Sequence, residues 1–284
     1  MGDPVSVGIV QMTGVPYEAE TNRRRSLERA GEAFAAGADV VVLPEMVVSG
    51  YALDPARLRE VAEEIDGATV EAWLEAADAA GGYVVGGLCE RDGERLYNSA
   101  VLVGDGRLLL HYRKLHLFAS EKDTLTRGDH GLPVVQTRLG MVGICVCYDL
   151  RFVETMRILA LQGAALVCVP TAWVTGFDAV RHDADGMPPQ AHAAVLQANL
   201  NQVFVACASQ VGEPDEFDLL GGSLIADPYG RRLCGPLSGA EEELAVAEID
   251  LAAAGAAQDR GGGVQPRSDR RTDVYGLAFE QRVL

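Results

Sequence analysis

Two hydrophobic patterns alternate along the chain. Short apolar runs rich in Val and Ile, bounded by Gly, Asp or Pro, predict strands. These runs are Val5–Gln11, Val40–Leu43, Tyr83–Gly87, Ser99–Val103, Leu108–Tyr112, Met141–Val146, Ala165–Val169, Val203–Ser209, Gly222–Ala226 and Leu244–Ile249. Alanine-rich segments with helical spacing predict helices over Glu18–Ala36, Pro55–Ala80, Phe152–Gln162 and Pro189–Asn201. The alternation of the two patterns predicts an α/β layered core.

Tight turns interrupt a simple strand–helix repeat. The segment from Tyr83 to Tyr112 reads as three strands joined at Arg91-Asp-Gly93 and Gly104-Asp-Gly106. The last third has hairpin spacing around Asp227-Pro-Tyr-Gly230. We therefore expect mixed rather than purely parallel sheets. Because no linker or repeat interrupts the 284 residues, we expect a single domain over 1–284, with the last ~25 residues as a tail.

The charge balance narrows the choice of partners. The chain carries 24 Lys and Arg against 41 Asp and Glu, a formal net charge of −17. Such a chain repels nucleic-acid phosphates and anionic lipid, so we expect neither nucleic acid nor a membrane as partner. No apolar run reaches the roughly 18–20 residues of a membrane span, and no signal core opens the chain. We expect a cytoplasmic protein.

Six cysteines are present: Cys89, Cys145, Cys147, Cys168, Cys207 and Cys234. They form no Cys-x-x-Cys pair, and a disulfide framework is not expected in a cytoplasmic chain of this size. Most fit the role of a small buried hydrophobe. No metal or other cofactor is expected, since no ligand spacing stands out.

Three residues with reactive side chains follow predicted strands. Glu45 ends Val40-Val-Val-Leu-Pro-Glu45, where apolar neighbours would raise its pKa and suit it to act as a general base. Lys114 follows Leu108–Tyr112 and could stabilise an oxyanion and lower the pKa of a thiol. Cys147 follows Met141–Val146 at the start of a predicted turn into a helix from about Arg151.

Each residue alone also fits a plainer role. Glu45 could be a solvated strand-end carboxylate, Lys114 a surface lysine and Cys147 a core thiol. The polar residues after Cys147 argue that the chain has left the core there. Together, a base, a cation and a thiol supply what acyl transfer through a thioester requires.

These motifs resemble the signatures of the nitrilase, or carbon–nitrogen hydrolase, superfamily. The matching segments are Leu43-Pro-Glu45, Tyr112-Arg-Lys114-Leu-His-Leu-Phe118 and Cys147-Tyr-Asp-Leu-Arg-Phe152. The resemblance extends over nearly the whole chain. It implies a four-layer α-β-β-α sandwich with two mixed sheets and a Glu-Lys-Cys triad.

The resemblance also implies roles for single residues. Glu45 would take the thiol proton of Cys147 and later activate water, while Lys114 and the backbone N–H of Tyr148 would hold the oxyanion. Glu121 matches a further glutamate of amidase members, and Trp173 a wall of the substrate pocket; in plainer roles they would be a loop carboxylate and a core aromatic.

Other expectations concern the surroundings of this site. Arg151 and Glu154 match a structural pair, and their spacing fits an ion pair across one helical turn. Leu200 stands where many relatives carry a glutamate, which puts a helix contact in doubt. The loop from Val174 to Pro189 is expected to shape the substrate site or contact another subunit.

The leading functional hypothesis is hydrolysis of a small amide, with release of ammonia or an amine. Nitrile hydrolysis by the same cysteine is one alternative. N-carbamoyl amide hydrolysis is another, although Phe152 stands where such relatives carry an extra basic residue. A non-catalytic protein that keeps the fold is a third, against which the three retained residues argue. By resemblance we expect a homodimer or a higher homo-oligomer.

Overall fold

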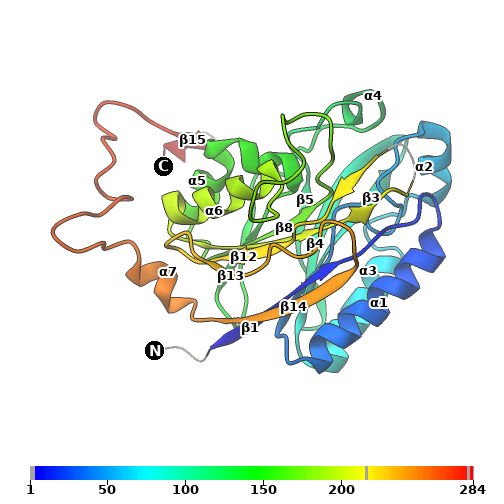
Figure 1. Ribbon diagram of the computed structural model, residues 1–284, viewed down its shortest axis with the longest axis horizontal. Coiled ribbons are helices and arrows are strands. Elements are labelled where there is room, and N and C mark those ends of the chain that lie inside the picture. Colours follow the sequence, from blue (N-terminus) through cyan, green and yellow to red (C-terminus); the bar gives the residue numbers. More distant parts are fainter. Residues whose placement is uncertain (1–3, 215–216, 280–281, 284) are drawn as a thin grey trace.

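Two six-stranded sheets stack face to face, with helices on their outer faces (Figure 1). The computed structural model describes residues 4–214, 217–279 and 282–283. Both sheets combine parallel and antiparallel pairs, because three parallel strands at the centre of each are flanked by antiparallel ones. The expected α-β-β-α sandwich with two mixed sheets is confirmed.

The first sheet has the order β14-β1-β2-β3-β4-β5. Its strands are β1 Val5–Gln11, β2 Val40–Val42, β3 Tyr83–Asp92, β4 Arg95–Gly104, β5 Arg107–Arg113 and β14 Glu243–Ile249. Strands β3, β4 and β5 form the predicted antiparallel meander, and all three are longer than the sequence pattern indicated.

The second sheet has the order β13-β12-β9-β8-β7-β6. Its strands are β6 Val134–Gln136, β7 Met141–Ile144, β8 Leu166–Thr171, β9 Phe204–Ser209, β12 Leu224–Ala226 and β13 Arg232–Cys234. The predicted turn at Asp227 joins β12 to β13, and its carboxylate accepts hydrogen bonds from the backbone N–H groups of Tyr229 and Arg231. Two short pairs lie outside both sheets: β10 Val211–Gly212 with β11 Leu219–Leu220, and β15 Ala278–Phe279 with β16 Arg282–Val283.

Helices cover the two outer faces. Helices α1 Ala19–Ala35 and α3 Ala68–Ala80 pack on the first sheet, and α5 Val153–Leu161 and α6 Pro189–Asn201 lie on the side of the second (Figure 1). The remaining helices are short: α2 Pro55–Val61, α4 Glu121–Thr124, a 3-10 helix over Cys147–Arg151, and α7 Ala252–Ala256.

Alternation along the strands sends side chains to two separate cores. In β2, Val40 and Val42 join the core between the sheets, while Val41 joins the core under α1 and α3. The same parity in β5 points Tyr112 toward the second sheet. Since successive strand residues face opposite sides, Arg113 and Lys114 are expected to diverge, and they do.

The predicted helix over Pro55–Ala80 is wrong in its middle. It is two helices, because the segment between them leaves the helical path to form a bridge from Glu63 to Glu90 at the edge of β3. The Glu63 carboxylate also accepts hydrogen bonds from the backbone N–H and hydroxyl of Thr69, at 2.8 and 2.6 Å. A turn signal, Asp66-Gly67, stands in this break, and Gly67 is the residue before α3 begins.

Within the described ranges, no helix is both long and apolar enough to cross a bilayer.

Candidate active site

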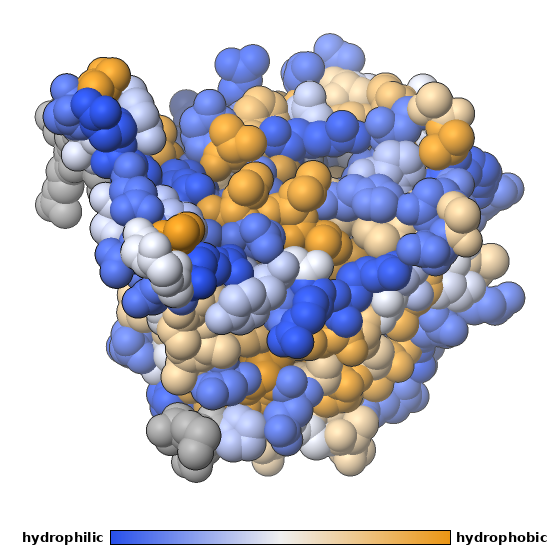
Figure 2. Space-filling model, turned by 60° about the vertical axis from the view of Figure 1, so that its left-hand side comes forward, coloured by the Kyte–Doolittle hydropathy of each residue, from blue (hydrophilic) through white to orange (hydrophobic). Residues whose placement is uncertain are grey.

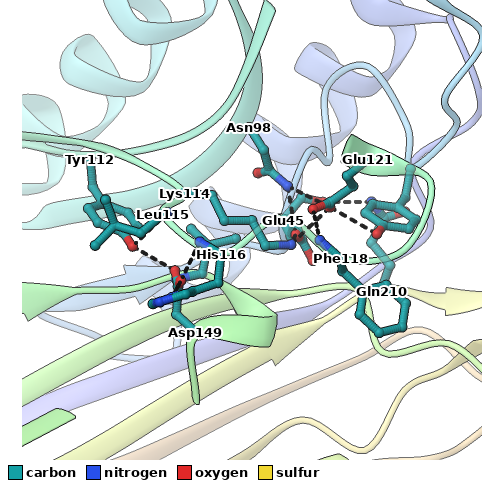
Figure 3. Close-up of polar contacts among 12 residues, drawn as sticks. Glu45, Asn98, Tyr112, Lys114, Leu115, His116, Phe118, Glu121, Asp149 and Gln210 are labelled. Atoms are coloured by element: carbon teal, nitrogen blue, oxygen red, sulfur yellow. Dashed lines mark hydrogen bonds and ion pairs between the residues drawn. The ribbon is translucent and has the colours of Figure 1, made fainter. Parts of the chain in front are cut away.

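A buried cluster of charges lies where the two sheets meet (Figure 3). The Lys114 Nζ atom is 2.6 Å from Glu45 Oε1 and 2.9 Å from Glu121 Oε1. All three side chains are fully buried. The structure therefore brings together three of the four residues that the sequence predicted to be catalytic, from segments far apart in the chain.

Local backbone contacts fix the position of Glu45. It follows β2 after Leu43-Pro44, and its N–H donates to Thr171 O at the end of β8, at 3.3 Å. Gly87 of β3 makes room for this turn, since a Cβ there would lie 2.7 Å from the Glu45 Cα. Strand ends of both sheets thus hold Glu45.

Two residues that the sequence analysis missed hold the carboxylates. Asn98 Nδ2 donates to Glu45 Oε1 at 2.7 Å and to Glu121 Oε1 at 3.0 Å. The Tyr51 hydroxyl donates to Glu121 Oε1 at 2.9 Å. An asparagine inside the apolar strand β4 was the available signal, because a buried amide needs partners.

The two oxygens of the Glu45 carboxylate differ in their hydrogen bonds. Among the described residues, Glu45 Oε2 is buried and has no hydrogen-bond partner. Burial raises the pKa of Glu45, and the Lys114 charge opposes that shift. The pKa of Lys114 lies above its usual range because the attraction of Glu121 and Glu45 outweighs the cost of burial. The site thus holds a permanent cation beside a carboxylate with one oxygen available to accept a proton.

Cys147 opens the 3-10 helix that follows β7, with a positive φ of 46°. Its thiol is close enough to Glu45, Lys114 and Glu121 for all three charges to affect its pKa. Burial raises that pKa well above its usual value, the Glu45 charge raises it further, and Lys114 lowers it only in part. The expectation that Lys114 lowers the thiol pKa is confirmed in direction, but burial outweighs this effect and keeps the thiol protonated at rest.

A second cluster holds the turn that carries Cys147 (Figure 3). Asp149 is fully buried, and its Oδ2 accepts hydrogen bonds from Val146 N at 2.9 Å and from the Tyr112 hydroxyl at 2.7 Å. Its Oδ1 lies 3.1 Å from His116 N and 2.7 Å from His116 Nδ1. Asp149 thus ties the cysteine turn to the segments on both sides of Lys114.

A small apolar cavity opens beside Cys147. Its volume is about 30 Å³, and its lining includes Phe118, Tyr148, Trp173 and Phe177. Tyr148 and Trp173, which the resemblance assigned to substrate binding, therefore border the same cavity as the thiol. The aromatic ring of Phe118 contacts those of Tyr148 and Phe177, with centroids 5.1 and 4.5 Å apart.

The expected pair between Arg151 and Glu154 is not formed. Arg151 Nη2 instead lies 3.0 Å from Asp178 Oδ2, in the loop between β8 and α6. Arg151 ends the 3-10 helix before α5 begins at Val153, so the two residues do not share one α-helical face. Leu200, at the position of the expected glutamate, is exposed.

The described residues include no group of three or more His, Cys, Asp or Glu that could hold a metal ion. In the loop from Val174 to Pro189, Asp183 pairs with His192 at 2.8 Å, and Arg181 pairs with Asp218. All six cysteines are free thiols, five of them buried.

Comparison with known proteins agrees with this geometry. The sequence model of the family described as Carbon-nitrogen hydrolase matches residues 6–259. The chain belongs to this family. It is a hydrolase that acts on C–N bonds, and its resemblance to amidase-like members of the nitrilase superfamily is confirmed.

Individual relatives have different names. A "Nitrilase" of Pyrococcus abyssi is 37% identical over 249 residues, which cover 87% of this chain and 90% of the relative. "Omega-amidase NIT2" of Xenopus tropicalis is 32% identical over 288 residues, covering 95% and 96%. The solved amidase of Nesterenkonia sp. superposes with a TM-score of 0.79 at 25% identity, covering 95% and 94%. One variant of that amidase shows the result of Michael addition of acrylamide at its active site cysteine.

Proposed function

We propose that this carbon–nitrogen hydrolase cleaves a small amide through a thioester on Cys147. The observation that carries the proposal is the arrangement around Lys114: a buried cation between two carboxylates, one of which has a buried oxygen without a partner among the described residues. Since the neighbouring thiol is protonated at rest, a base with a free oxygen is the group that the first step requires.

The steps follow from these positions. Cys147 Sγ attacks the amide carbon while its proton passes to Glu45 Oε2. The oxygen of the tetrahedral intermediate takes a negative charge, which Lys114 and the backbone N–H of Tyr148 stabilise. The C–N bond then breaks, and the leaving nitrogen takes the proton from Glu45. Ammonia or an amine departs, and a thioester remains.

Hydrolysis of the thioester uses the same residues. Glu45 takes a proton from water as the water oxygen attacks the thioester carbon. The C–S bond breaks, and the proton returns to the sulfur, so the enzyme is restored and a carboxylic acid leaves. Glu121 orients the Lys114 ammonium through its 2.9 Å contact and is itself held by Tyr51 and Asn98.

The named relatives support this assignment. The amidase of Nesterenkonia sp. shares the fold over nearly its whole length and can be modified at its active site cysteine. The curated relatives include an omega-amidase over 95% of this chain. Both support Cys147 as the nucleophile and an amide as the substrate.

Nitrile hydrolysis is the second candidate, because the Pyrococcus abyssi relative is called a nitrilase. Attack of Cys147 on a nitrile carbon would give a thioimidate, which water converts to an acid and ammonia. An N-carbamoyl substrate is less favoured, since Phe152 supplies no second cation beside Arg151.

Matched substrates test the proposal. Ammonia release is measured from butyramide and from butyronitrile with wild type, Cys147→Ala and Lys114→Ala. We expect release from the amide in the wild type and a loss of at least about 1,000-fold in both variants. Turnover of the nitrile alone would establish the second candidate, and unchanged turnover in Cys147→Ala would end the proposal.

The assembly and location remain predictions. Large apolar side chains are exposed on α5 and α6, namely Val153, Leu196 and Leu200. Figure 2 shows hydrophobic residues gathered on one face of the molecule between hydrophilic ones. Such a surface supports the homo-oligomer that the resemblance implies. We further propose a cytoplasmic enzyme with no nucleic-acid or membrane partner. The net charge of −17 supports the absence of those two partners.

A further inference from the structure

We infer that the site selects amides with a short, uncharged acyl group, and that Asp178 enforces this choice by occupying Arg151. The inference rests on the proposed amidase function and specifies its substrate class. It follows from the lining of the cavity beside Cys147, from the charges around it, and from the ion pair at its edge.

The cavity favours a small apolar group. Its volume of about 30 Å³ leaves room for a short chain only. Phe118, Leu150, Trp173, Val174 and Phe177 supply most of its apolar lining. A short alkyl chain would bury its surface here. A carboxylate would lose its hydration, and among these five side chains only the indole N–H of Trp173 could donate a hydrogen bond to it.

One cation borders the cavity among the described lining residues. This is Arg151, whose guanidinium is 3.0 Å from the Asp178 carboxylate. A free guanidinium would hold a substrate carboxylate in a paired geometry. Because Asp178 already contacts Nη2 of this guanidinium, a negatively charged acyl group would have to compete with Asp178 for Arg151.

The loop that carries Asp178 is held over the cavity. Phe177, next to Asp178, packs its ring against Phe118. Farther along the same loop, Arg181 forms an ion pair with Asp218. Thr175 N donates to Asp218 O at 3.0 Å. These contacts position the Asp178 carboxylate beside Arg151.

The remaining charges also disfavour an anion. Lys114 faces two carboxylates, so the buried cluster has a net negative charge when both are ionised. Gln190 borders the cavity with a buried carbonyl oxygen that has no partner among the described residues, and this group accepts hydrogen bonds. Its amide nitrogen donates to Val174 O at 3.2 Å. The chain as a whole carries −17, which repels anionic substrates at long range.

Butyramide and succinamate form a suitable pair of substrates. They have the same carbon chain and the same primary amide, but the terminal methyl of one is a carboxylate in the other. The measurement is kcat/KM for ammonia release by wild type, Asp178→Asn, Asp178→Glu and the double variant Asp178→Asn/Arg151→Gln. Asp273→Asn serves as a matched control, because Asp273 pairs with Arg271 on an exposed segment.

We expect the wild type to prefer butyramide by about 100-fold or more, since the pocket would leave a buried carboxylate unpaired. Asp178→Asn should raise kcat/KM for succinamate about tenfold by freeing Arg151, with a change of less than about threefold for butyramide. Asp178→Glu should keep the wild-type preference. The double variant should lose the gain, and Asp273→Asn should behave as wild type.

The possible outcomes distinguish a failure of this inference from a failure of the proposed amidase function. A wild type that hydrolyses succinamate as well as butyramide would overturn the substrate class and leave the amidase proposal intact. An Asp178→Asn protein that melts as wild type does but shows no gain on succinamate would overturn the role of Asp178, again leaving the amidase proposal intact. Absence of hydrolysis of every amide would overturn both proposals.

Discussion

Arg113 and Lys114 are neighbours in the chain, yet their buried ion pairs lie on opposite faces of the first sheet and differ in how completely they are hydrogen-bonded. Arg113 turns to the outer side of the first sheet and pairs with Glu90 of β3. Lys114 turns to the space between the sheets and pairs with Glu45 and Glu121. Strand geometry alone separates the two side chains, since consecutive residues point to opposite faces.

The Glu90 pair is fully satisfied. Both oxygens of Glu90 accept hydrogen bonds from Arg113, and Oε2 also accepts one from the Ser99 hydroxyl and lies 2.7 Å from His111 Nε2. Burial disfavours the charge, but His111, Arg113 and Ser99 outweigh it and lower the pKa of Glu90 to about 2. The carboxylate is therefore fixed in its charged form.

The Glu45 pair is only half satisfied. Its Oε1 accepts hydrogen bonds from Lys114 and Asn98, but Oε2 has no partner among the described residues, and burial raises its pKa. A fully bonded carboxylate stabilises the fold, whereas a carboxylate with an unpaired oxygen costs stability and can take a proton. Under the proposed function, this difference is what distinguishes the catalytic ion pair from the structural one.

The largest effect should come from Glu45→Gln. We expect kcat/KM to fall at least about 1,000-fold, because an uncharged amide cannot take the thiol proton. The melting temperature should stay the same or rise, since Lys114 keeps Glu121 as a partner and one buried charge is lost. Ammonia release and thermal unfolding check both parts. Glu94→Gln is the control, because Glu94 is 99% exposed, and equal effects of the two changes would contradict the account.

Glu90→Gln should show the reverse behaviour. It leaves the Arg113 guanidinium without its buried partner, so we expect the free energy of unfolding to fall by about 2–4 kcal/mol. The protein that remains folded should keep kcat/KM within about fivefold, since Glu90 lies on the face away from the site. Urea unfolding and active-site titration measure these quantities. A large loss of activity per folded molecule would show that the two pairs are not separable.

Acid should affect the two carboxylates in different ranges of pH. Glu45 must be ionised to act, and its pKa is raised, so kcat/KM should fall with an acid midpoint above the ordinary 4.5. Glu90 has a pKa of about 2 in the fold, below its unfolded value. Its contribution is therefore complete above about pH 4.5 and is lost as pH falls toward 2. A pH–rate profile and acid unfolding curves measure the two; an activity midpoint below 4.5 would exclude Glu45 as the base.

Asn98→Ala should give the smallest change. Asn98 donates to both carboxylates of the Lys114 cluster, so its loss should move the acid midpoint of kcat/KM upward and lower the rate about tenfold. The shift in the pH profile distinguishes a role in positioning Glu45 from a purely structural one. A lower rate with an unmoved midpoint would contradict the assignment.

Most of this site could be predicted from the sequence, because the ends of strands can be recognised where an apolar run stops. Glu45, Lys114 and Cys147 each follow an apolar run, and the layered fold brings such positions to one edge. The 3-10 helix after Cys147 was missed, since a few residues cannot establish a period. The break after Val61 was missed although the turn signal Asp66-Gly67 lies within it. The three-residue strands β6 and β13 were not predicted, because so short a segment shows no clear alternation.

The partners of charged side chains were harder to predict than their positions. Arg151 was assigned to Glu154 from helical spacing, but a loop residue 27 positions away, Asp178, takes it. Tyr51 and Asn98 reach the carboxylates through tertiary contacts of 70 and 23 residues in sequence separation. No local pattern encodes such contacts, because they depend on how the two sheets and their loops pack.

The most direct test is to trap the acyl group on the thiol. Wild type, Cys147→Ala and Glu45→Gln are mixed with butyramide, quenched in acid within one turnover, and measured by intact-protein and peptide mass spectrometry. The account predicts a butyryl adduct on Cys147 in the wild type, with the other five cysteines unmodified, and none in either variant. Ammonia release without any adduct on Cys147, or an adduct on another residue, would contradict it.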